Sequence, residues 1–115
     1  MIRVNCLTAI LAAVALPAAA DATLLNDYPT EARADYVFGC MAVNGQTRDT
    51  LRRCSCSIDV IATVLTYAGY VAAETVLTMR QAAGERSALF RDTQPAMTDV
   101  ANLRRAQAEA EILCF

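Results

Sequence analysis

The sequence predicts an all-α fold, a compact disulfide-stapled bundle of about four helices. Two observations predict it. Apolar residues recur every three or four positions in several segments, which is the period of one face of a helix. After residue 20 the chain carries the cysteines Cys40, Cys54, Cys56 and Cys114, and an even number in so short a chain is typical of a small exported domain held by disulfides.

Residues 1–20 have the features of a secretory signal peptide. Arg3 precedes a largely apolar run, and small residues suit cleavage by a signal peptidase after Ala20 or after Ala22. The run is shorter than the roughly 20 residues that a transmembrane helix needs, so we expect no membrane contact after cleavage. The expected organisation is a signal peptide at 1–20 and a single helical domain at 21–115, located in the periplasm.

Composition narrows the classes of function. Ten basic residues stand against 12 acidic ones, and because the arginines are scattered among acids we expect no nucleic-acid partner. The chain has no histidine, which removes Ser-His and Cys-His nucleophile activation, histidine-ligated zinc and the usual ligation of haem. We therefore expect a protein that is not an enzyme.

The first helix is expected between Pro29 and the pair Asn44-Gly45. Proline is favoured at a helix start, and Asn-Gly is a common helix stop. Tyr36, Val37, Cys40 and Met41 share one face of this segment. A short turn then leads to the next helix, so the two form an antiparallel hairpin.

The second helix contains both cysteines of the segment CSC. Thr47 and Asp49 supply an N-terminal cap and a favourable charge in the first turn. An apolar stripe follows at helical spacing, and it consists of Leu51, Cys54, Ile58, Ile61 and Leu65. Cys54 should therefore face the core, whereas Cys56 lies nearer a second stripe that contains Val60 and Val64.

Two further helices are expected downstream. Thr66 can cap a third helix and Gly84 can end it. We expect residues 85–95 to form a loop in which Leu89 and Phe90 fold back onto the core. The last helix is expected from about Pro95 to Leu113.

The cysteine spacing allows two sets of disulfides. Cys54 and Cys56 cannot easily pair with each other, because positions i and i+2 of a helix point about 200° apart. In the helical hairpin, Cys40 lies near the level of Cys54, which favours the bonds Cys40–Cys54 and Cys56–Cys114. The alternative, Cys40–Cys56 with Cys54–Cys114, remains open.

Acidic side chains are the candidate metal ligands. Asp27, Glu31 and Asp35 recur every four residues across the start of the first helix. Carboxylate oxygens without nitrogen or sulfur suit hard cations, so the expected cofactor is a lanthanide or calcium ion. The alternative needs no ligand, because Arg33 and the positive end of the helix also stabilise these charges.

Asp59 needs a partner from elsewhere in the fold. No arginine lies three or four residues from it on its own helix. We expect either a salt bridge to Arg104 or Arg105 of the last helix, or a ligand or cation.

Several short motifs give the chain a family likeness. They are Tyr28-Pro29-Thr30, Tyr36-Val37, Cys40-Met41, the segment CSCSID at 54–59, Tyr70-Val71 with Ala73, and the terminal Cys114. In these motifs the chain resembles the LanD family, small periplasmic four-cysteine helical proteins of methylotrophic bacteria that act as lanthanide chaperones. The likeness covers most of the chain after residue 20.

The resemblance implies a role in handling lanthanides beside quinoprotein alcohol dehydrogenases. It also implies a site shared across a metal-bridged dimer, so the expected partners are a periplasmic dehydrogenase or a second copy of the chain. A looser likeness exists to immunity proteins of type VI secretion systems, which are also small, exported, helical and disulfide-bonded. That likeness implies the alternative function, a protein-interaction module or chaperone-like factor.

Overall fold

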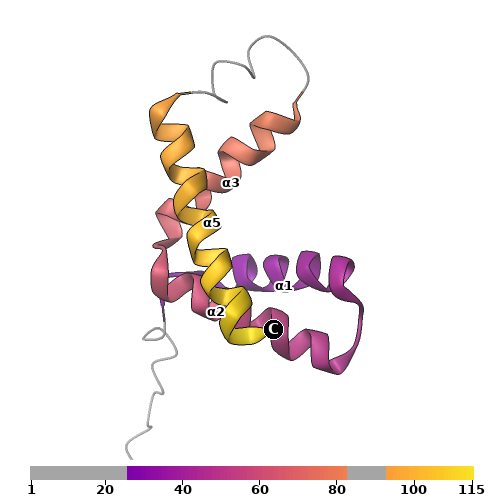
Figure 1. Cartoon of the computed structure of the whole chain (residues 1–115). Coiled ribbons are helices and arrows are strands. Elements are labelled where there is room, and N and C mark those ends of the chain that lie inside the picture. Colours follow the sequence, from indigo (N-terminus) through magenta and orange to yellow (C-terminus); the bar gives the residue numbers. More distant parts are fainter. Residues whose placement is uncertain (1–25, 83–92) are drawn as a thin grey trace, which may run out of the picture.

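The computed structural model describes residues 26–82 and 93–115, which form four α-helices and no strand (Figure 1). The predicted all-α fold with disulfides between helices is therefore confirmed. The signal peptide at 1–20, the helix stop at Gly84 and the loop residues Leu89 and Phe90 lie outside the described residues.

The first helix, α1, spans Thr30–Asn44. Pro29 is its N-cap residue, in extended backbone, and Gly45 ends the helix with a φ of 103°. This left-handed region is open to glycine at little cost, which explains why Asn44-Gly45 marks the end of the helix correctly.

The next two helices begin at the threonine caps that the sequence predicts. α2 spans Arg48–Val64, and the hydroxyl of Thr47 accepts a hydrogen bond from the backbone N–H of Thr50 at 3.1 Å. α3 spans Tyr67–Gln81, and Thr66 accepts in the same way from Gly69 at 3.2 Å. Each cap satisfies an N–H group that has no partner within its own helix.

The chain bends by 110° between α2 and α3. Within 26–82 and 93–115, no single helix has the length and apolar character that crossing a membrane requires. Only α2 and α3 taken together, as this bent pair, meet that requirement by length and composition.

The last helix, α5, spans Gln94–Cys114 and packs against both α2 and α3 (Figure 1). α1 lies antiparallel beside α2, so the α1–α2 hairpin and the α3–α5 pair form two arms that meet where α5 crosses α2. The C-terminal end of α5 lies beside α2, as the label C in Figure 1 shows.

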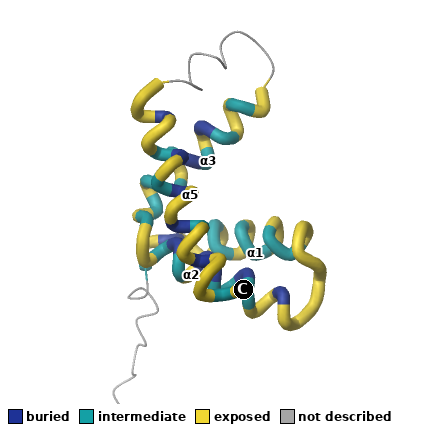
Figure 2. Tube along the Cα trace, in the orientation of Figure 1, coloured by how far each residue is buried: buried dark blue, intermediate teal, exposed yellow. Residues whose placement is uncertain are grey.

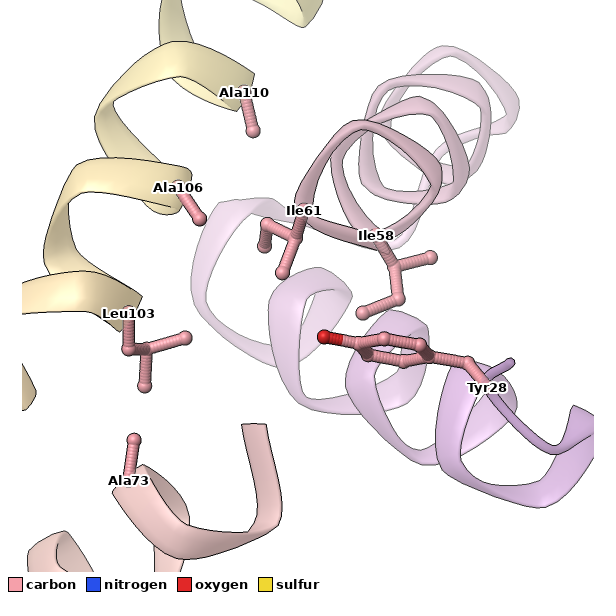
Figure 3. Close-up of a cluster of buried hydrophobic side chains, with 7 residues drawn as sticks. All are labelled: Tyr28, Ile58, Ile61, Ala73, Leu103, Ala106 and Ala110. Carbon is pink, nitrogen blue, oxygen red and sulfur yellow. The ribbon is translucent and has the colours of Figure 1, made fainter. Parts of the chain in front are cut away.

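The core lies where these elements meet. Ile58 and Ile61 of α2 pack with Leu103 of α5, and small residues let the helices approach closely (Figure 3). The buried cluster consists of Tyr28, Ile58, Ile61, Ala73, Leu103, Ala106 and Ala110. A second cluster joins the far ends of α3 and α5 and consists of Val76, Ala96 and Val100.

α1 differs from the other helices because it has no buried residue. In Figure 2 it carries only intermediate and exposed positions, whereas α2, α3 and α5 each present buried positions to one another. The helix is attached to α2 by a disulfide and by a hydrogen bond of 2.9 Å between the hydroxyls of Tyr36 and Ser57. Tyr36 and Val37 also pack against the core cluster while staying partly exposed, so α1 is a surface helix whose side chains are only partly buried.

The structure has the favoured disulfides, Cys40–Cys54 and Cys56–Cys114, which confirms this pairing over the alternative. Cys54 is fully buried, as its stripe predicts. The two bonds indicate an oxidising, extracytoplasmic environment.

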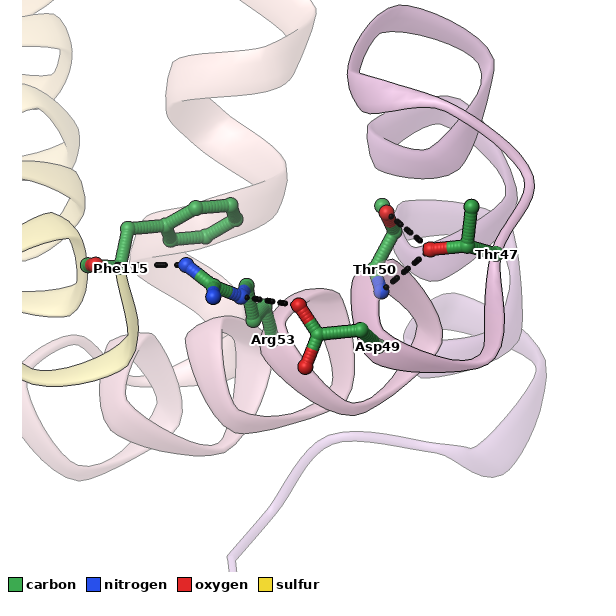
Figure 4. Close-up of polar contacts among 5 residues, drawn as sticks. All are labelled: Thr47, Asp49, Thr50, Arg53 and Phe115. Atoms are coloured by element: carbon green, nitrogen blue, oxygen red, sulfur yellow. Dashed lines mark hydrogen bonds and ion pairs between the residues drawn. The ribbon is translucent and has the colours of Figure 1, made fainter.

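The second disulfide brings the chain end to the middle of α2, and Arg53 of the same helix contacts Phe115 (Figure 4). Arg53 donates a hydrogen bond to the carbonyl of Phe115 at 3.3 Å and lies over the ring of that residue. The Arg53 guanidinium also pairs with Asp49 at 2.7 Å.

Candidate functional site

Acidic side chains gather at a hollow between the start of α1 and the first two turns of α3. The hollow has a volume of about 440 Å³. Its lining combines carboxylates from both helices with two tyrosine rings, and consists of Pro29, Glu31, Ala32, Asp35, Tyr67, Tyr70 and Glu74. We refer to it as the acidic hollow.

Tyr28 fixes the start of α1 against α3. Its side chain is buried, and its hydroxyl donates a hydrogen bond to the carbonyl of Leu65 at 3.0 Å. Its ring centroid lies 5.3 Å from the ring centroids of both Tyr67 and Tyr70. Such aromatic contacts are favourable. Tyr28 therefore helps to hold Tyr67 and Tyr70 in place, and these two rings line the acidic hollow.

Asp27 has a structural contact of its own. Its carboxylate accepts a hydrogen bond of 2.9 Å from the backbone N–H of Tyr67, the first residue of α3. A carboxylate at a helix N-terminus is stabilised by the free N–H groups and the helix dipole. Asp27 therefore lies at the neighbouring hollow, which also includes Tyr28 and Arg33, and outside the lining of the acidic hollow.

The acids of the hollow have no arginine partner in the described part of the chain. Arg33, which the sequence offers as their neutralising neighbour, instead lies 4.0 Å from the Asp59 carboxylate on α2. The other ion pair among these residues joins Arg53 to Asp49, far from the hollow. Among residues 26–82 and 93–115, no arginine forms an ion pair with Glu31, Asp35 or Glu74.

Two side chains of the acidic hollow, Glu74 and Tyr70, have raised pKa values. Burial, and then the nearby carboxylate of Asp35, raise the pKa of Glu74. Burial, followed by the charge of Glu74, raises the pKa of Tyr70 to about 12. Burial and neighbouring negative charge thus both oppose ionisation of these groups. A bound cation would offset part of the free-energy cost of ionising them.

The salt bridge of Asp59 corrects the sequence prediction. The expected partner was Arg104 or Arg105 on the last helix, and this was wrong, because the pair forms with Arg33 on α1. Asp59 is an exposed residue on the side of α2 that faces α1. α5 packs on another side of α2, so its arginines do not meet this carboxylate.

Two of the three predicted ligands meet in the structure. Glu31 and Asp35 line the acidic hollow together, and Glu74 joins them from α3. Glu74 was missed by the sequence reasoning, although Tyr67, Tyr70 and Glu74 are spaced by three and four residues and so share one face of a helix. That spacing was the signal that could have found it.

The acidic hollow is not a closed coordination cage. Across residues 26–82 and 93–115, no three acidic or cysteine side chains lie close enough together to hold a metal ion. Glu31 and Asp35 are exposed side chains, which can move without unpacking the core. The arrangement thus offers converging negative charge that a cation would have to draw together.

An apolar groove lies between α1 and α2. Its volume is about 500 Å³, and its floor is formed by apolar side chains of both helices. The lining residues are Thr30, Arg33, Ala34, Val37, Phe38, Met41, Ser55, Ile58 and Asp59. We refer to it as the α1–α2 groove.

Comparison with known proteins finds no match: no family model, no curated protein and no solved structure matches this chain.

Proposed function

We propose that this chain is a periplasmic, non-catalytic accessory protein that binds a hard cation at the acidic hollow. The observation that carries the proposal is the convergence of Glu31, Asp35 and Glu74 on one hollow, with no arginine partner among the described residues. Hard cations take oxygen ligands, and carboxylates offset their charge.

The donors fit such an ion in chemical type. All polar side chains that line the hollow end in oxygen, from carboxylates or from the hydroxyls of Tyr67 and Tyr70. A calcium site uses about 6–8 oxygen ligands, so water or a second protein molecule must supply part of the shell. This requirement agrees with the metal-bridged dimer that the resemblance to the lanthanide chaperones implies.

The resemblance also favours the identity of the ion. A lanthanide is the first candidate and calcium the second, because three carboxylates match the charge of a trivalent cation. The proposed role is metal handling in methylotrophic metabolism, with a periplasmic quinoprotein dehydrogenase as the receiving partner. The chain has no histidine for acid–base or nucleophilic chemistry, which supports a binding role over catalysis.

Terbium luminescence tests the proposal. Tyr67 and Tyr70 line the hollow, so terbium bound there should show emission sensitised by excitation of tyrosine. Replacing Glu31→Gln together with Asp35→Asn, or Glu74→Gln alone, should weaken binding by about tenfold or more, since each change removes negative charge from the ion's surroundings.

The matched control is Glu111→Gln, which removes an exposed carboxylate in the last turn of α5, outside the lining of the acidic hollow. It should leave the emission unchanged. Absence of emission, together with no rise in melting temperature when lanthanum or calcium is added, would reject the proposed function. Emission that survives the substitutions in the hollow would show that the ion binds elsewhere.

A second candidate is a protein-interaction module, such as an immunity protein or a chaperone-like factor. The α1–α2 groove favours it, because an exposed apolar groove of this kind marks a contact surface more often than a site for an ion. The terbium experiment separates the two candidates, since an interaction module has no need of a cation at the acidic hollow.

A further inference from the structure

The α1–α2 groove carries both a hollow and a projecting ring. Val37, Met41 and Ile58 form its apolar floor. Phe38 lies at the same groove but leaves 76% of its surface exposed. Removing an exposed phenylalanine ring from water is favourable. A surface that covered Phe38 together with the apolar hollow would therefore gain free energy.

The charges of the groove are also matched to each other. Arg33 and Asp59 both line it, and they lie 4.0 Å apart with side-chain exposures of 29% and 63%. A contact this long, between a partly buried arginine and an exposed aspartate, contributes little to stability. Both charges are therefore available to a partner that presents the opposite charge at the same spacing.

We propose that the α1–α2 groove is the docking surface for a second copy of this chain, related to the first by a twofold axis. A twofold interface places one patch against the same patch, so each copy must supply both halves of every contact. The groove does so: Phe38 enters the hollow of the other copy, and Arg33 faces the partner's Asp59.

This association does not depend on a bound metal. The acidic hollow uses Glu31 and Asp35 and opens toward α3, whereas the groove uses Val37, Phe38 and Met41 and opens toward α2. The two surfaces lie on different faces of α1, so a cation and a second copy can be bound at the same time. The proposal stands whether or not the proposed function is correct.

α1 has no buried residue within one copy, which gives docking a physical gain. Covering the groove buries apolar side chains that a single chain leaves partly in water. Each copy contributes one projecting ring and one solvent-accessible ion pair, so the expected affinity is weak, with a dissociation constant on the order of micromolar.

Sedimentation velocity of the exported, oxidised chain in the presence of EDTA tests the proposal. The weight-average mass should rise from monomer to dimer as the protein concentration increases. Phe38→Ser should weaken association by about tenfold or more, because it removes the projecting ring. The control is Val43→Ser, an equally exposed apolar residue of α1 that lies outside the groove, and it should have no effect.

Reversing the charge of Arg33 or of Asp59 provides a second test. It separates a contact between two copies from an ion pair that only stabilises the single chain. Arg33→Asp alone and Asp59→Arg alone should each be monomeric, because like charges would meet twice across the axis. Mixing the two variants should restore a dimer that contains one copy of each, since both contacts are then attractive. An ion pair confined to a single chain would give no such rescue on mixing.

A chain that remains monomeric at all concentrations would overturn the proposal and assign the groove to a different protein. A dimer that persists in Phe38→Ser, or that shows no preference for the mixed charge variants, would overturn it as well. A dimer that forms only after lanthanum replaces EDTA would reject this interface and support a metal-bridged dimer at the acidic hollow instead.

Discussion

Glu74 occupies a position that costs free energy in the protein alone. It lies partly buried on α3, and the carboxylate of Asp35 faces it across the acidic hollow. Burial and like charge both oppose ionisation, which is why the pKa of Glu74 is raised. A bound cation would reverse the second effect and offset part of the first.

The raised pKa predicts how stability depends on pH. Because the folded chain holds this proton more tightly than the unfolded chain, Glu74 favours folding at low pH and loses that contribution as pH rises from its ordinary value of 4.5 through the raised folded value. Urea unfolding across this range should show Glu74→Gln gaining stability relative to the original chain as pH rises.

Below the ordinary pKa the stability difference between the two proteins should become constant. The exposed Glu111→Gln serves as the control and should track the original chain throughout. Parallel stability profiles for Glu74→Gln and the original chain would contradict this assignment. Cation affinity should follow the same titration, since a protonated carboxyl is a poor ligand, so terbium binding should weaken as pH falls.

At the scale of single residues, the sequence predicted only part of the site. Glu31 and Asp35 are one helical turn apart, so their shared face follows from helix geometry alone. Glu74 approaches them only because Tyr28 packs the start of α1 against Tyr67 and Tyr70 of α3. That contact depends on tertiary packing, which local periodicity does not contain.

At the scale of helices, local signals placed the boundaries well. Thr47 and Thr66 cap α2 and α3 as their spacing indicated, and Gly45 ends α1. The partner of Asp59 was wrong because the sequence does not say which neighbouring helix lies on which side of α2. The cap that Asp27 provides for α3 was likewise invisible, because it joins residues far apart in the chain.

The surface position of α1 gives a prediction at this scale. The double variant Cys40→Ala/Cys54→Ala, which lacks the first disulfide, should have a free energy of unfolding lower by ~3 kcal/mol under the loop-entropy model. Since α1 has no buried residue, its backbone amides should also exchange with solvent much faster in this variant, while those of α5 remain protected. Hydrogen exchange measured by mass spectrometry would resolve the two helices.

The matched comparison is the double variant Cys56→Ala/Cys114→Ala. It removes the disulfide whose cysteines are 58 residues apart, whereas those of the first disulfide are 14 apart. It should cost ~4 kcal/mol and leave exchange in α1 nearly unchanged. Equal exchange in α1 for both variants would contradict the view that Cys40–Cys54 is the main attachment of this helix.

At the scale of the whole molecule, sulfur and oxygen have separate roles. Both disulfides tie α2 to its neighbours, one to α1 and the other to the end of α5, and the cysteines are thereby used in the scaffold. We propose that the carboxylates at the start of α1 provide the contacts to a cation. The even count of cysteines predicted the first role, and the helical hairpin favoured the pairing that the structure has, although the sequence left the alternative open.

The acidic hollow and the α1–α2 groove lie on different faces of one lightly held helix. α1 supplies Glu31 and Asp35 to the first and Val37, Phe38 and Met41 to the second. A small displacement of α1 would change both surfaces together. Binding at one is therefore expected to influence binding at the other, with the coupling equal in both directions.

We propose that a hard cation binds between α1 and α3 through carboxylates. The most direct test is a nuclear magnetic resonance map of the oxidised protein with substoichiometric gadolinium, whose unpaired electrons broaden nearby amide signals. The account predicts that broadening is strongest around Glu31, Asp35 and Glu74 and weak around the Cys56–Cys114 disulfide. Broadening centred on Glu109 and Glu111, or spread evenly over the surface, would contradict it.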